Sequence, residues 1–251
     1  HVSIIMAALQ TFLRIWALAH AFRIISARLS NTGALVSFQG AALAAAFLFP
    51  RLPAAALLAL VVRIAALLGK LPLIHDSQMW VLQLDLLLLA ALLGHLVRSR
   101  ASPLRPLSPA AGDEIVQSIG PTVRALLSIF YFAAAFWKVN HAFLDARYSC
   151  APVFLMQQLD FLPFDLPDAA VSAIASLAPA AVLTIEFAVP AALLLGRRPG
   201  VLAVLALHLV IAICPPPNNI GCFGVATCSR LFLLVPDETS AFLAALPSRP
   251  R

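Results

Sequence analysis

The chain has 251 residues, of which 62% are apolar and 11% charged, and its mean hydropathy is +0.95. These values exclude a typical soluble domain, and no polar stretch is long enough to form a separate globular domain. The net charge of +6 does not indicate nucleic-acid binding, because the arginines stand at the ends of apolar runs, where they meet lipid headgroups. We therefore predict an all-α, polytopic helical membrane bundle, with residues 1–251 as one integral-membrane domain and membrane lipids as partners.

The first residue is His1 rather than Met, and it already belongs to an apolar segment. This start fits either a chain that lacks an N-terminal piece or one from which a targeting peptide has been removed. Removal would point to an organellar membrane or a secretory route, and the sequence leaves the two alternatives open.

Eight apolar segments are candidate membrane spans, since a span needs about 20 apolar residues. In chain order they cover residues 2–25, 32–49, 53–69, 79–97, 121–143, 169–195, 201–214 and 220–235. Between the fourth and fifth segments we predict a polar connecting loop over residues 98–120. After the fifth we predict an interfacial helix over residues 151–166, where apolar residues alternate with polar ones. Pro179 and Pro190 predict kinks in the sixth segment.

The distribution of charge favours eight spans. Eight spans place one group of basic residues on one side of the membrane: Arg51, Arg98, Arg100, Arg105, Arg197, Arg198, Arg249 and Arg251. The other side receives Arg28, Lys70 and Arg147, together with the acidic residues Asp145, Asp160, Asp165 and Asp168. By the positive-inside rule, both termini and the 98–120 loop then lie inside. Seven spans would place the C-terminal arginines outside.

Ionisable residues also occur within the expected spans: Arg14, Arg63, Asp85, Lys138 and Glu186, with Arg23 near an end. On insertion scales a lysine at the centre of a membrane helix raises the free energy of insertion by about 2.5–3.5 kcal/mol. We therefore expect Lys138 to have either an oppositely charged partner or a functional role. One interpretation is that Lys138 pairs with Glu186 or Asp85 and fixes the packing of the helices. Another is that a desolvated Lys138 acts as a catalytic base, with Glu186 tuning it. A third is that Lys138 binds a ligand or a lipid headgroup.

Four histidines, His20, His95, His141 and His208, lie in or at the ends of expected spans. A neutral imidazole in a membrane helix can ligate the iron of haem or the magnesium of chlorophyll, and it can equally hydrogen-bond a neighbouring helix. These histidines are therefore candidate cofactor-binding residues, although their spacing is not diagnostic.

The cysteines do not indicate a metal site. Cys222 and Cys228 are six residues apart, which does not match a Cys-x-x-Cys motif. In the expected topology Cys150, Cys214 and Cys222 lie near the outer face, where one disulfide could form, and free buried thiols are the favoured alternative.

Two stretches resemble a known family. Tyr131-Phe132-Ala133-Ala134-Ala135-Phe136-Trp137-Lys138-Val139-Asn140, followed by Phe143-Leu144-Asp145, resembles the Tyr-Phe-x-Ala-Gly-x-x-Lys-Leu-Asp/Asn…Trp pattern of the HTTM (horizontally transferred transmembrane) superfamily. That superfamily includes the membrane domain of vitamin K-dependent γ-glutamyl carboxylases. Thr184-Ile185-Glu186-Phe187, the later Leu195-Gly196-Arg197-Arg198 and then His208 resemble the family's glutamate helix, basic turn and histidine helix. The resemblance is clear over residues 121–236.

The resemblance implies a role for Lys138, because the matching lysine of the carboxylases is the base that deprotonates reduced vitamin K. Several family features differ in this chain. Ala135 and Phe143 replace a glycine and a tryptophan, His75-Asp76-Ser77-Gln78 replaces an Asn-His pair, and the large soluble domain that follows the membrane region in carboxylases is not in the sequence. We therefore do not expect glutamyl carboxylation by this chain alone.

Three functions are consistent with these patterns. The first is a structural or accessory subunit of a larger membrane assembly, in contact with other integral-membrane subunits and holding lipid, quinone, chlorophyll or haem. The second is a small membrane enzyme that uses Lys138 as a base on a quinone or lipid-like substrate. The third is a transporter with Asp85, Lys138 and Glu186 along a polar path. We favour the first because the catalytic set is incomplete and the many small residues permit close helix packing.

Overall fold

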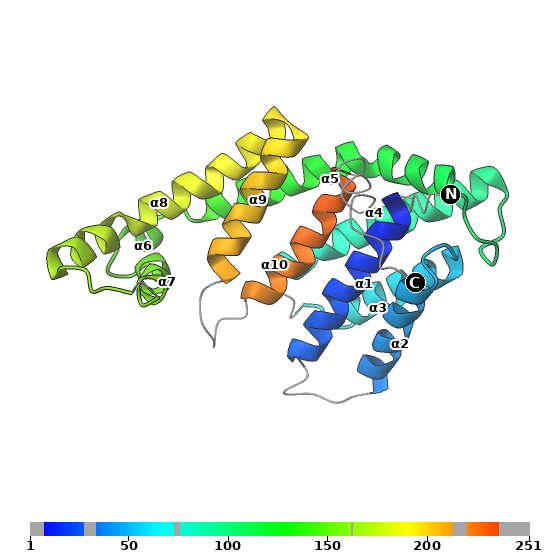
Figure 1. Ribbon diagram of the computed structural model, residues 1–251, viewed down its shortest axis with the longest axis horizontal. Helices are drawn as coiled ribbons and strands as arrows, with labels where there is room; N and C mark the ends of the chain where they lie inside the picture. The colour runs from blue at the N-terminus through cyan, green and yellow to red at the C-terminus, as the bar shows by residue number, and fades with distance from the viewer. Residues whose placement is uncertain (1–7, 28–33, 73–75, 162, 213–219, 236–251) are drawn as a thin grey trace, which may run out of the picture. The chain divides into compact units, whose positions relative to one another are not determined.

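The computed structural model describes residues 8–27, 34–72, 76–161, 163–212 and 220–235 (Figure 1). Within these ranges the chain is helical and contains no strand, which confirms the all-α prediction. Each of the eight expected apolar segments overlaps a helix. Three helices in the described part of the chain are long and apolar enough to cross a membrane: the Gln78–Ser99 portion of α4 (Asp76–Ser99), α5 (Pro109–Trp137) and α8 (Asp168–Leu195). The number of eight spans stays a prediction.

The chain forms two compact units, and the first combines His1–Val123 with Val225–Arg251. In this unit successive helices pack against one another, α1 on α2, α2 on α3 and α3 on α4, and η1 lies against α1 (Figure 1). These elements are α1 (Ala8–Ala27), α2 (Ala34–Leu48), α3 (Pro53–Leu68), α4 and the 3₁₀ helix η1 (Arg230–Leu233). Segments from both ends of the chain therefore share one core.

The polar connection between α4 and α5 is shorter than the predicted 98–120 loop. α4 continues to Ser99, and α5 already begins at Pro109. Ser108 caps the start of α5, because its hydroxyl accepts a hydrogen bond from the amide of Ala111 at 3.2 Å. Pro109 then occupies the first helical position, which suits proline. Pro121, expected at the start of the fifth span, lies inside α5.

The second unit is Arg124–Gly224, which holds the end of α5 together with α6 (His141–Leu144), α7 (Cys150–Leu159), α8 and α9 (Arg197–Ala212). α6, α7 and α9 all pack on α8 (Figure 1). α7 overlaps the predicted interfacial segment 151–166, and its place in a membrane stays a prediction. The packing of α9 on α8 requires glycine at position 200, in the first turn of α9, because a Cβ there would lie only 2.7 Å from the Cα of Leu193 in α8.

Large apolar side chains occupy exposed as well as buried faces of these helices. In α8, Val189 and Leu193 are buried, whereas Ile185 and Leu194 are exposed and Leu195 is 86% exposed. Helices that are apolar on every face are typical of segments surrounded by lipid or by other membrane helices.

Candidate functional site

Lys138 lies in a turn one residue beyond the end of α5, not inside a helix as the 121–143 segment predicted. Asn140 explains why the helix stops there. Its side-chain oxygen accepts a hydrogen bond from the amide of Phe143 at 2.9 Å and so caps α6. Its side-chain amide donates to the carbonyl oxygen of Trp137 at 2.8 Å, which satisfies a backbone group at the last turn of α5.

The ammonium group of Lys138 donates a hydrogen bond to Oε1 of Glu186 on α8 and forms an ion pair with it. This contact confirms one of the two predicted partners, and the other, Asp85, is engaged elsewhere. The side chain of Lys138 is 33% exposed and that of Glu186 is 10% exposed. The ammonium also lies 5.8 Å from the ring centre of Phe143. A carboxylate and an aromatic face both attract an ammonium cation, so this position is built for a charged lysine.

The second carboxylate oxygen of Glu186, Oε2, differs from Oε1 in its hydrogen bonding. Oε2 is buried and accepts no hydrogen bond from the described residues. Most buried polar atoms in proteins have a partner, so an oxygen of this kind is a place where a donor from water, lipid or ligand can bind.

A second polar contact joins α5 to α9 in the same unit. The hydroxyl oxygen of Tyr131 lies 2.6 Å from Nε2 of His208, and both side chains are buried. The two rings meet edge to face, with centroids 6.0 Å apart. Lys138 follows Tyr131 by seven residues, so both contacts involve the C-terminal end of α5 and the turn after it.

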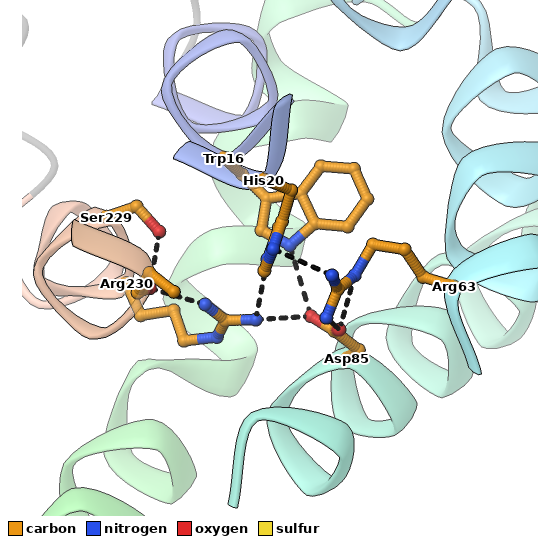
Figure 2. Close-up of polar contacts among 7 residues, drawn as sticks. Trp16, His20, Arg63, Asp85, Ser229 and Arg230 are labelled. Atoms are coloured by element: carbon orange, nitrogen blue, oxygen red, sulfur yellow. Dashed lines mark hydrogen bonds and ion pairs between the residues drawn. The ribbon is translucent and has the colours of Figure 1, made fainter. Parts of the chain in front are cut away.

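The first unit contains a buried charge cluster, which we call the Asp85 cluster: Trp16, His20, Arg63, Asp85 and Arg230 (Figure 2). Arg63 donates to Oδ2 of Asp85 from Nε at 2.9 Å and from Nη2 at 2.6 Å. Arg230 donates to Oδ1 from Nη2 at 2.6 Å, and the indole of Trp16 donates to the same oxygen at 3.1 Å. The cluster therefore ties α1, α3, α4 and η1 together through one carboxylate.

His20 lies between the two guanidinium groups of this cluster (Figure 2). Its Nδ1 is 2.7 Å from Nη1 of Arg63, and its Nε2 is 3.2 Å from Nη2 of Arg230. Both ring nitrogens thus face guanidinium groups, and neither is available to a metal ion in this arrangement.

Sequence reasoning did not identify Trp16 and Arg230 as members of a site. For Arg230 a signal was present, because an arginine inside the apolar segment 220–235 needs a buried partner just as Lys138 does. For Trp16 there was none, since a tryptophan in an apolar helix is ordinary.

The other predicted cofactor-binding histidines lie apart from these contacts. His95 is buried in α4, and His141 is exposed at the start of α6. In the described part of the chain, no group of three His, Cys, Asp or Glu side chains could hold a metal ion. Cys150 and Cys228 are free thiols, whereas Cys214 and the side chain of Cys222 are outside the described residues. His75, in the stretch that replaces the family's Asn-His pair, is outside them as well.

Asp145, in the turn between α6 and α7, has a perturbed carboxyl group. Arg147 donates to it from Nη2 at 2.6 Å, from Nε at 3.0 Å and from the backbone amide at 3.0 Å. These hydrogen bonds lower the pKa of Asp145 to about 2, and those from the side chain of Arg147 contribute most.

No protein-family model, curated protein or solved structure matches this chain. The HTTM resemblance therefore rests on its residues alone and stays a prediction.

Proposed function

We propose that this chain is an HTTM-like, multi-pass membrane protein with about eight spans that acts as a structural or accessory subunit of a larger membrane assembly. Three apolar helices of membrane-spanning length support the membrane assignment. Apolar side chains exposed on α8 and α9 suit contact with lipid or with other membrane subunits. Quinone or pigment remains the class of small molecule that we expect such an assembly to hold.

The observation that carries the accessory role is the pair between Lys138 and Glu186. A catalytic base must direct its nitrogen at a substrate, whereas the ammonium of Lys138 is directed at Oε1 of Glu186. An ion pair between two segments is instead well suited to hold helices in one arrangement.

Purification of the full chain from its native membrane in mild detergent tests this role. We expect the chain to migrate with other integral-membrane polypeptides, and we would record the absorption spectrum and extract bound small molecules from that fraction. A colourless chain that purifies alone and stays stable would contradict the proposal.

Paired substitutions test what Lys138 does. If the pair is structural, Lys138→Met and Glu186→Met should each lower the yield of folded protein, because each leaves one charge without its partner. The double variant should recover folding and co-purification, since it leaves no charge behind. Lys70 is exposed, so Lys70→Met is the matched control and should fold like the wild-type protein.

A membrane enzyme that uses Lys138 as a base is the alternative, and two observations favour it. Lys138 is one-third exposed, and Oε2 of Glu186 accepts no hydrogen bond from the described residues. A substrate hydroxyl could occupy that oxygen and draw the carboxylate away from the lysine. A Lys138→Met variant that still folds and assembles but has lost the turnover of a quinone or lipid-like substrate would favour this alternative.

A further inference from the structure

We propose that the Asp85 cluster binds one anionic group, which is either a small free anion or the phosphate of a lipid headgroup. This inference goes beyond the proposed function and does not depend on it. It follows from two separate shortages at the cluster, one of negative charge and one of hydrogen-bond acceptors.

The shortage of charge is evident from the contacts of the two arginines. Arg63 and Arg230 are both buried, and an arginine side chain stays charged in a protein. Among the described residues, the one carboxylate in contact with either guanidinium group is that of Asp85, which both of them share. Two cations thus face one anion at a place where Arg230 is only 1% exposed. A buried charge without compensation is strongly unfavourable.

The shortage of acceptors is at His20. A neutral imidazole has one nitrogen that accepts and one that donates. If Nδ1 accepts from Arg63 across 2.7 Å, then Nε2 carries a hydrogen and points it at Nη2 of Arg230, 3.2 Å away. Two donors then face each other, and the opposite tautomer creates the same conflict with Arg63. Protonation of His20 would add a third positive charge.

One anion removes both shortages. It would neutralise the second guanidinium charge and accept hydrogen bonds from Arg230 and from the donating nitrogen of His20. A water molecule could accept those hydrogen bonds, but it would leave the excess charge in place. An anionic group, unlike water, removes both shortages.

Thermal unfolding of the detergent-purified full chain tests a free anion. At constant ionic strength, replacing gluconate by bromide should raise the Tm of the wild-type protein by about 5 °C, because a ligand that binds the folded state stabilises it. Arg230→Met should lose this response, since Arg63 and Asp85 are then balanced and His20 accepts from Arg63 alone. Arg105→Met removes an exposed arginine from the connection between α4 and α5, so it should keep the wild-type response.

Elemental analysis distinguishes the two sources. After removal of free salt, the bromide-exchanged wild-type protein should retain about one bromide per chain more than Arg230→Met if the site takes a free anion. If a lipid phosphate fills the site, the wild-type protein should instead retain about one more phosphorus atom per chain after extensive washing, without a bromide response. If Arg230→Met does not fold, Arg63→Met provides the same comparison, because it leaves Arg230 balanced by Asp85.

Equal bromide and phosphorus contents in the wild-type and variant proteins would overturn the proposal. The sequence also holds Asp237 and Glu238, which lie outside the described residues. If the wild-type protein does not respond to bromide but the Asp237→Asn, Glu238→Gln double variant does, the compensating charge belongs to the chain itself, and the proposal is wrong.

Discussion

The hydroxyl of Tyr131 and the Nε2 atom of His208 lie 2.6 Å apart and connect α5 to α9 within one compact unit. The two residues are separated by 77 positions in the sequence, and both are buried. Because the contact is withdrawn from water, its loss leaves a buried ring nitrogen without this partner.

Tyr131→Phe should therefore lower the free energy of unfolding by about 1–2 kcal/mol. Urea or thermal denaturation of the detergent-solubilised protein measures this change. Tyr148 is exposed, so Tyr148→Phe is the matched control and should stay within about 0.5 kcal/mol of the wild-type value. Equal effects from the two variants would show that the buried contact does not contribute to stability.

Gly200→Ala should destabilise the protein by about 3 kcal/mol or more, because the added Cβ would lie 2.6 Å from Cδ2 and 2.7 Å from Cα of Leu193. The backbone of α8 or α9 would have to move to accommodate it. Gly40→Ala in α2 is the control, since no atom lies within 4 Å of the Cβ position there, and it should be neutral or stabilising. Yield of monodisperse protein and Tm report both outcomes, and an unchanged Gly200→Ala protein would contradict the close packing.

Asp85→Asn should cost about 3–5 kcal/mol, because it leaves Arg63 and Arg230 buried without their shared carboxylate. We expect little folded protein from this variant. Glu114→Gln, which removes an exposed carboxylate of the same unit, should behave as the wild type. The Asp85→Asn, Arg230→Met double variant should be more stable than Asp85→Asn alone, since it removes one of the two unpaired charges. Equal stability of the single and double variants would contradict this account.

Asp145 should titrate near pH 2 in the folded protein. An unfolded chain has an aspartate pKa of about 3.9, so the folded-state value is depressed and the unfolded state binds the proton more tightly. The contribution of Asp145 to stability is therefore present above about pH 4 and is lost as the pH falls toward about 2. Hydrogen exchange of the amides of Tyr148 and Ser149, which donate to the Asp145 carbonyl, should accelerate over this interval.

Arg147→Met tests the cause of that shift. Without the guanidinium donor, the carboxyl of Asp145 should titrate closer to the ordinary aspartate value, and exchange of the turn amides should accelerate at a higher pH. An Asp145 titration that is the same in both proteins would exclude Arg147 as the cause.

The position of Lys138 illustrates where sequence reasoning reached its limit. The apolar pattern continues through Val139, so a helix was expected to continue as well. The structure ends α5 at Trp137, because Asn140 caps the following helix and binds the carbonyl of Trp137. A single side chain that forms two short-range hydrogen bonds overrides apolar periodicity, which carries no information about helix ends.

The sequence also did not determine which buried charges pair with one another. Glu186 was one of two partners considered for Lys138, and the sequence had no means to choose between it and Asp85. Arg230 of η1 reaches Asp85 of α4 across 145 positions of sequence, so their pairing depends on tertiary packing.

By itself the sequence determined that the chain is helical and apolar, with polar or proline-containing connections between its apolar segments. That much is local, because an apolar segment without water must satisfy its backbone hydrogen bonds internally, and a helix does so within the segment. The tertiary structure alone decided which charges meet, with Glu186 for Lys138 and two arginines for Asp85. The reason is physical: an ion pair acts over a few ångströms in space, and distance along the chain does not determine which side chains come that close.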